Sequence, residues 1–468
     1  MQLLPRYPDQ GSLYRLYSGL IERQFKFIKL PLMAQHKKKP GKQQMQKLLS
    51  AQYRNEFFRR LQFVINSHSG GNNYSRIPPK ILDFTFKARF HPFKLVQAKG
   101  CRIPEGLMRE AGRDIPVLVK LQTICLLPAS CPIPLSDFFT VVLSVNLINA
   151  QLKEGNLIQA RSIREAVDNI LQDAELYQRA YRCFYFVLLS YCICKSELGK
   201  CLYWMKHEVN VSLEPPLGFE NIVTVHSVQP ESVQLNIDGN IRPAIRVGWA
   251  FPFDGIQWCG LKPSLFNPGS SGEDEPMKVY IQSHALNRLA ERIDCFSAGS
   301  AQYNMWLSLD QPKVCLHAAG HILIEFRFYD VKAGYFLAEI VNGAIMIRTF
   351  LFLTQGGTPE GEILIKNTGL KKLDLKCLAI DKLSSFISSD ISDNEEVRNI
   401  FTAAGCQSLM DLHAKLSDLC TKQSRQSTAR LILRYLKKAD PVLPLNLTEG
   451  LSAETLRECS TALHYEAG

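Results

Sequence analysis

The stretch GYFLAEIVNGAIMIRTFLFLT, residues 334–354, is rich in β-branched and aromatic residues on both sides of Asn342-Gly343. Asn-Gly is the pair that a two-residue type I′ turn favours, because both turn positions need a positive φ. Another run of the same kind, HILIEFRFYD, precedes it at residues 321–330. These runs predict a three-stranded antiparallel meander with a hairpin at Asn342-Gly343.

The two-residue turn also predicts the register of the hairpin and its two faces. The expected facing pairs are Val341 with Ala344, Glu339 with Met346, and Leu337 with Arg348. Side chains alternate between the faces of a strand, so one face is expected to be core and the other half polar. The expected core residues are Phe336, Ala338, Ile340, Ile345, Ile347, Leu351 and Leu353. The half-polar face is expected to carry Tyr335, Glu339, Arg348 and Thr354.

An amphipathic helix is expected upstream, in VYIQSHALNRLAERIDCF at residues 279–296. A short β-like run, Val279–Ile281, leads into a helix that begins near Ser283. Apolar residues gather on one side of this helix, at Leu286, Leu289, Ala290 and Ile293. His284, Arg288 and Arg292 are spaced four apart and form a polar stripe on the other side. The simplest interpretation of this stripe is the solvated face of an ordinary helix.

The order of a helix bearing H-x-x-x-R-x-x-x-R and a β-meander with threonine after its last strand resembles the RelE/barnase-like ribonuclease fold of toxin modules. The resemblance covers residues 278–366. It implies a sheet that cradles RNA and a metal-independent ribonuclease site. The implied catalytic residues are His284, Arg288, Arg292, Arg348, Thr354 and Thr358. A histidine of near-neutral pKa can move the proton of a ribose 2′-hydroxyl, and arginines can stabilise charge on the phosphate.

Length and composition place the chain among multi-domain globular proteins. It has 468 residues, of which 46% are hydrophobic and 21% charged. Its apolar runs are shorter than a membrane span needs, and its first residues lack the apolar core of a secretory signal, so a cytoplasmic location without membrane contact is expected. The fourteen cysteines include no C-x-x-C pair, and no phosphate- or dinucleotide-binding motif occurs, so neither a metal nor a cofactor is expected.

Charge is unevenly distributed along the chain. Residues 1–113 hold 22 Lys and Arg against 6 Asp and Glu, whereas the remaining residues hold 33 against 38. A basic module of this kind favours RNA or another nucleic acid as partner. The expected contact residues, interleaved with aromatic side chains, are Lys37, Lys38, Lys39, Lys42, Arg59 and Arg60. The alternatives are that the aromatic residues are core and that the basic module docks on the acidic remainder of the chain.

The sequence predicts an α+β, multi-domain protein divided into six parts. These are a basic N-terminal module (1–113), a mainly helical region (114–214), a β-rich region (215–266), a linker (267–276), a helix-plus-meander domain (277–392) and C-terminal helices (393–468). Alternation of apolar residues predicts strand structure from residue 78 to 96, and two antiparallel helices are expected from 174 to 209. The expected function is a nucleic-acid-associated protein with an RNA-cleaving domain, or alternatively a non-catalytic protein–protein interaction protein.

Overall fold

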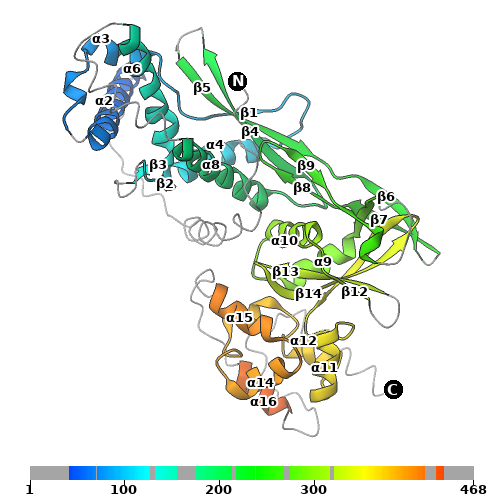
Figure 1. Ribbon diagram of the computed structural model, residues 1–468. Helices are drawn as coiled ribbons and strands as arrows, with labels where there is room; N and C mark the ends of the chain where they lie inside the picture. The colour runs from blue at the N-terminus through cyan, green and yellow to red at the C-terminus, as the bar shows by residue number, and fades with distance from the viewer. Residues whose placement is uncertain are drawn as a thin grey trace. The chain divides into compact units, whose positions relative to one another are not determined.

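The computed structural model describes residues 42–69, 71–126, 132–154, 174–212, 218–237, 239–266, 275–316, 321–416 and 428–436. The chain forms two compact units, each described by itself. Unit 1 comprises residues 1–192, 203–228 and 250–256, and unit 2 comprises residues 193–202, 229–249 and 257–468. Both units combine helices with sheets, so the protein is α+β and multi-domain (Figure 1). In the part of the chain that the structure describes, no helix combines the length and apolar character needed to cross a bilayer.

Unit 1 packs helices around a small sheet of order β1-β5-β4, in which β1 and β5 are parallel. Its core is built from aromatic side chains, among them the fully buried Phe138, Phe139 and Phe184. The elements that lie wholly or mainly in unit 1 are α2 (Lys42–Ser69), η1 (Tyr74–Arg76), α3 (Pro79–Lys87), β1 (Lys94–Gln97), α4 (Glu105–Leu121), β2 (Thr123–Ile124), β3 (Ile133–Pro134), α5 (Leu135–Asp137), the π-helical η2 (Phe138–Val142), α6 (Leu143–Glu154), α8 (Ala174–Lys195), β4 (Leu202–Ser212) and β5 (Gly218–Val228).

Two sequence predictions for unit 1 are wrong. Residues 79–87 form helix α3 and not a strand, because the helix places Phe86 against Phe57 of α2, with their ring centroids 5.5 Å apart. Prolines at its start favour the helix, since proline suits the first turn. The second antiparallel helix expected near residue 202 is strand β4. Its burial alternates along Met205–Glu208, which is strand and not helix periodicity.

Unit 2 is built on one mixed sheet, which has eight strands among the described residues. Its strand order is β12-β13-β14-β15-β11-β7-β6, and β10 also pairs with β11. The strands are β6 (Ser232–Ile237), β7 (Asn240–Arg246), β10 (Gly260–Leu261), β11 (Met277–Gln282), β12 (Val314–Leu316), β13 (Ile322–Phe328), β14 (Val331–Val341) and β15 (Ala344–Phe352). A separate two-stranded ladder joins β8 (Gly248–Phe251) and β9 (Gly255–Trp258), and η3 spans Pro263–Leu265.

This sheet corrects the predicted division of the chain. Strand β11 pairs in parallel with β15 on one side and antiparallel with β7 on the other. The hairpin of β6 and β7, expected in a β-rich region of its own, therefore belongs to the same sheet as the meander. Residues 267–274 of the expected linker lie outside the described residues, while Glu275 and Pro276 are exposed.

The hairpin at Asn342-Gly343 is confirmed. Asn342 and Gly343 have φ angles of 49° and 74°, as a type I′ turn requires, and Val341 faces Ala344. Glu339 also faces Met346 as predicted. Leu337, however, faces Thr349 and not Arg348.

A β-bulge causes this shift of register. It brings Phe350 and Phe352 onto the core face, both almost fully buried, while Leu351 is half-buried. Ile340 shows a second departure from the predicted core. It lies near the end of β14 and is 50% exposed.

The two faces of the sheet are covered differently. The helix-covered face, which carries Ile245, Ile281 and Ile347 in register, is covered by α9 (Ser283–Arg292) and α10 (Ala298–Asp310). The opposite face, called the second face here, carries Ala244, Tyr280 and Met346.

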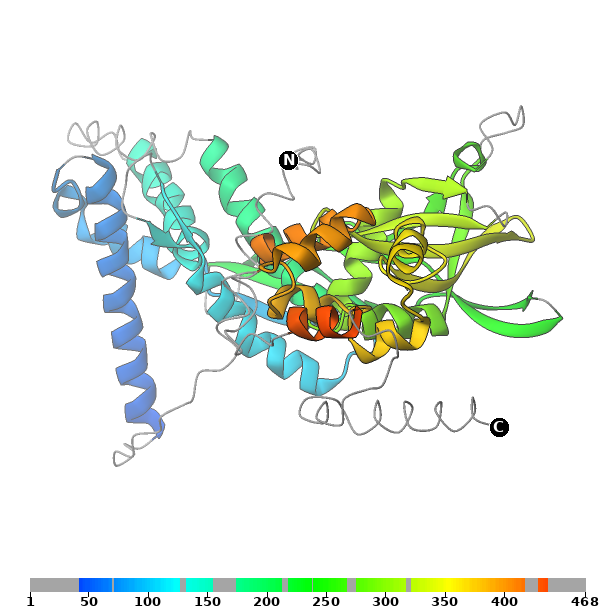
Figure 2. The same ribbon diagram turned by 90° about the horizontal axis from the view of Figure 1, so that it is seen from below.

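The C-terminal helices cover the part of the second face around β14, and α15 packs directly on this strand (Figures 1 and 2). These helices are α11 (Pro359–Thr368), α12 (Lys372–Cys377), α13 (Leu383–Ser388), α14 (Glu395–Ala403), α15 (Gln407–Leu416) and α16 (Thr428–Leu436).

Candidate functional site

Helix α9 turns its apolar side to the helix-covered face of the sheet. A Cβ atom placed on Gly199 would lie within 4 Å of both Leu286 and Ile245, so Leu286 packs on the same side as Ile245. Leu289 is fully buried. His284 is exposed, and Arg288 forms an exposed ion pair with Glu291 at 2.6 Å. The start of the predicted stripe therefore faces solvent.

Arg292, at the other end of the stripe, is buried and not solvated. Its guanidinium forms an ion pair with Asp381, whose side chain is also buried. Two residues further along the chain, Asp294 accepts hydrogen bonds from the backbone N–H and the hydroxyl of Ser384. Arg292 thus joins α9 to the segment before α13, which is a structural role.

The remaining predicted catalytic residues lie on other parts of unit 2. Arg348 bonds Glu339 at 2.9 Å, and Glu339 faces Met346, so this ion pair lies on the second face. Thr354 and Thr358 are fully buried.

The hydroxyl groups of both threonines form hydrogen bonds with backbone atoms. The Thr354 hydroxyl donates to the carbonyl of Ile380, and the Thr358 hydroxyl caps α11 by accepting from the N–H of Gly361. Because α9 covers one face of the sheet and Arg348 lies on the other, the predicted catalytic residues do not converge on one concave surface.

The arginines of the expected nucleic-acid site are engaged in ion pairs. Arg59 and Arg60 both bond Glu56 at 2.7 Å and hold its pKa at about 2. Arg60 also reaches the buried Asp137 at 2.6 Å, which ties α2 to α5. Of the expected lysines, Lys37, Lys38 and Lys39 lie outside the described residues, and Lys42 is described by its place in α2 alone. Both described arginines of the expected site are therefore engaged by carboxylates of the same chain.

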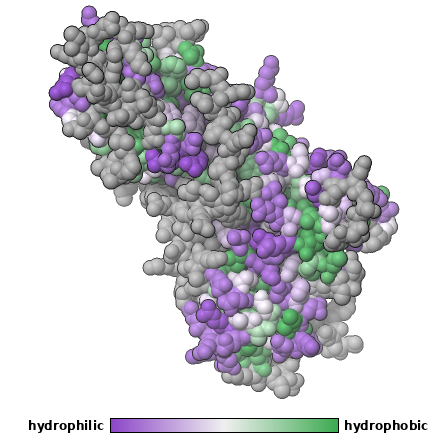
Figure 3. Space-filling model, viewed as in Figure 1, coloured by the Kyte–Doolittle hydropathy of each residue, from purple (hydrophilic) through white to green (hydrophobic). Residues whose placement is uncertain are grey.

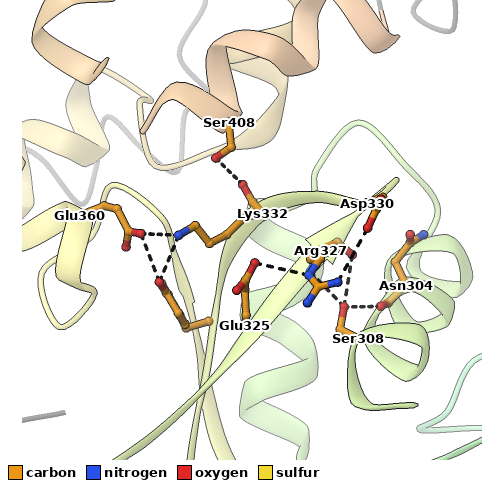
Figure 4. Close-up of polar contacts among 9 residues, drawn as sticks. Asn304, Ser308, Glu325, Arg327, Asp330, Lys332, Glu360 and Ser408 are labelled. Atoms are coloured by element: carbon orange, nitrogen blue, oxygen red, sulfur yellow. Dashed lines mark hydrogen bonds and ion pairs between the residues drawn. The ribbon is translucent and has the colours of Figure 1, made fainter. Parts of the chain in front are cut away.

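A buried polar network that the sequence did not point to lies between β14 and the C-terminal helices (Figure 4). Lys332 donates to Glu360 at 2.5 Å, and the hydroxyl of Tyr335 donates to the same carboxylate oxygen at 3.2 Å. The backbone carbonyl of Lys332 accepts from Ser408 at 2.8 Å. Burial and the neighbouring Glu360 carboxylate raise the pKa of Tyr335, so its hydroxyl stays protonated and can donate.

This network fastens α11 and α15 to the sheet. Glu360 occupies the first turn of α11, where the helix dipole favours a negative charge. Its second carboxylate oxygen is buried without a hydrogen-bond partner among the described residues. Gly405 lies so close that an added Cβ would come within 3.2 Å of the Glu360 side chain. We therefore interpret the network as a tether.

The part of the second face that the C-terminal helices leave open forms a groove of about 480 Å³. Tyr280 lines the groove, and its side chain is buried against Ala244 and Met346, which lie in the core beside it. The half-buried walls are Val233 and Leu235 of β6 on one side and Val341 and Ala344 of the hairpin on the other. Strands β6 and β14 lie four positions apart in the sheet, so the sheet must curl for one groove to touch both.

The groove is close to neutral. Its charged lining residues are Glu275 and Lys278, one of each sign. Two arginines on the same face are balanced by carboxylates, since Arg246 bonds Glu231 at 3.4 Å and Arg348 bonds Glu339. Among the described residues, no three His, Cys, Asp or Glu side chains gather into a group that could hold a metal ion. The groove is therefore suited to apolar contacts.

Alternation of apolar residues in β6, β11 and β15 was the available signal for this groove. It shows which side chains share a face within one strand, but not that β6 and the hairpin belong to one curled sheet. Comparison of the chain with protein-family models, with curated proteins and with solved structures gives no match.

Proposed function

We propose that this chain is a non-catalytic protein-interaction protein and that the groove on the second face receives an apolar segment of its partner. The observation that carries the proposal is an open groove lined by Tyr280 and by the half-buried apolar side chains of Val233, Leu235, Val341 and Ala344. Its volume lies in the range of about 300–1,000 Å³ that ligand sites occupy.

Charge favours a neutral protein segment over a nucleic acid as the occupant. Surfaces that bind nucleic acids carry a clear excess of positive charge, because phosphates dominate their affinity. Arg246 and Arg348 on this face have carboxylate partners, and Lys278 has Glu275 close by in the chain, so Arg242 of β7, opposite Leu235, adds a single positive charge. A segment with apolar side chains at alternate positions matches such a lining, since alternate side chains of an extended peptide point the same way.

Neighbouring residues of β14 provide a matched pair of variants. Val341 lines the groove, whereas Ile340 points to the helix-covered face and is half exposed. We expect Val341→Glu to weaken binding of a short fluorescein-labelled peptide with leucine at alternate positions by at least about tenfold, or about 1.4 kcal/mol. Ile340→Glu should leave this binding unchanged, and binding should vary little between about 50 and 200 mM salt.

Fluorescence anisotropy measures both properties. An oligouridylate RNA with the same label is the comparison ligand. Salt-sensitive binding of the RNA without binding of the peptide would restore the nucleic-acid interpretation. Equal effects of the two variants on the peptide would remove the groove from the proposal.

A further inference from the structure

Strand β6 is an edge of the unit 2 sheet without the usual protection. Its sequence, SVQLNI, contains neither a charged residue nor a proline, and its one described neighbour is β7. Natural edge strands are commonly blocked by lysine, proline, a bulge or very short length, because an open edge can pair with another strand. The opposite edge strand, β12, has only three residues. The edge of β6 is twice as long.

The register of the β6–β7 hairpin shows which backbone groups this edge offers. Ile237 faces Asn240 across the turn, so hydrogen bonds to β7 fall at Ile237, Leu235 and Val233. The intervening residues, Ser232, Gln234 and Asn236, therefore point their N–H and C=O groups away from β7. Pro243 faces Gln234 in a position that needs no N–H, which agrees with this assignment. The side chains of Ser232, Gln234 and Asn236 are exposed.

We infer that a second copy of this chain pairs with β6 along this edge. An antiparallel pair about a twofold axis at Gln234 sets Gln234 opposite itself and Ser232 of one copy opposite Asn236 of the other. No like charges meet, because the whole strand is uncharged, so the edge complements itself. Each copy adds its Val233 and Leu235 to the apolar row of the second face.

The surroundings of β6 fit an added strand. The hairpin projects from the rest of the sheet in both ribbon views (Figures 1 and 2). Ile241, which faces Asn236 on the neighbouring strand, is 74% exposed, so the rest of the chain covers this part of the hairpin little. The pairing lies in the plane of the sheet and so uses a different surface from the interior of the groove.

Sedimentation velocity of the full chain over a range of concentrations tests this inference. We expect the wild type to reach twice its chain mass of 53.0 kDa. Gln234→Pro removes an outward N–H and places a ring on the edge, while the bonds to β7 remain. This variant should stay at 53.0 kDa where the wild type is dimeric, which corresponds to dimerisation weaker by at least about tenfold.

Gln234→Thr is the matched control, because it keeps the N–H and suits a strand. It should dimerise like the wild type, and the thermal unfolding of both variants shows whether each is folded. Should Gln234→Pro misfold, Gln234→Lys serves instead, since it sets two like charges across the twofold axis. A wild type that is monomeric at all concentrations overturns the inference, and so does a folded Gln234→Pro or Gln234→Lys that dimerises as well as Gln234→Thr. Because the peptide assay reads the groove alone, the two proposals can fail separately.

Discussion

His207 is enclosed by aromatic rings in the core of unit 1. The ring centroids of Phe184, Phe139 and Phe93 lie between 5.1 and 5.7 Å from its imidazole. Its Nε2 lies 3.1 Å from the amide oxygen of Asn221, and the amide nitrogen of Asn221 donates to the carbonyl of His91. This arrangement leaves the Asn221 oxygen to accept, so Nε2 of His207 donates. Burial lowers the pKa of His207 to about 4, although the hydrogen bond to Asn221 opposes this shift.

This pKa predicts a loss of stability on acidification. The unfolded state binds the proton with an ordinary pKa of about 6.5 and the folded state only near 4, so unfolding takes up a proton between these values. The stabilisation is complete above about pH 6.5 and is lost as the pH falls towards 4, by up to about 3 kcal/mol. Chemical denaturation at several pH values measures it. His207→Gln, which keeps a donor for Asn221, should flatten the profile, and an unchanged slope would exclude His207 as the cause.

Glu360 provides a second prediction at the level of single residues. Its side chain is only 10% exposed and carries the counter-charge of Lys332, so Glu360→Gln leaves a half-buried ammonium without a carboxylate. We expect the free energy of unfolding to fall by about 1–3 kcal/mol. The control is Glu339→Gln, which breaks the pair with Arg348 at 26% exposure and should cost under about 1 kcal/mol. If chemical denaturation showed that Glu360→Gln and Glu339→Gln lower the free energy of unfolding equally, the tether role of Glu360 would be contradicted.

Helix α9 shows how much of an element its sequence determines. Its start near Ser283 and its amphipathic character follow from the sequence pattern, and the structure confirms both. The burial of Arg292 does not follow, because its partner Asp381 is far away in the sequence. The bulge opposite Leu337 was equally hidden, since alternation continues through Arg348 without a sign of the extra residue.

The packing of α9 predicts opposite results for two alanine variants. Leu289→Ala removes a fully buried side chain and should cost about 2–5 kcal/mol. His284→Ala alters an exposed side chain and should change stability by less than about 0.5 kcal/mol. It should also leave unchanged any cleavage of a labelled RNA by the purified protein. Thermal unfolding and a gel assay measure these effects. Loss of cleavage in folded His284→Ala would return the polar stripe to a catalytic role.

At the scale of the whole molecule, the sheet of unit 2 unites segments that the sequence separates. The pairing of β11 with both β7 and β15 could not be predicted from the sequence, because the alternation of apolar residues within a strand does not show which strands lie beside it. The meander itself was predictable, since its strands are consecutive and its turn is Asn-Gly. The space-filling view shows apolar residues reaching the surface in the region of β12 and the β14–β15 hairpin (Figure 3), and Leu316 of β12 and Ile340 of β14 are exposed. Exposed apolar residues are therefore not confined to the groove. What distinguishes the groove is that residues of β6 and of the β14–β15 hairpin line one hollow.

Methionine methyl groups offer the most direct test of the groove. Met277 lines the groove and Met346 is buried against Tyr280 of its lining, whereas Met305 and Met410 are buried in α10 and α15. In a protein labelled at its methionine methyl groups, the alternating-leucine peptide should shift the NMR signals of Met277 and Met346. It should leave those of Met305 and Met410 in place. Shifts confined to Met305 or Met410, or shifts of Met277 and Met346 caused by the oligouridylate RNA and not by the peptide, would contradict the account.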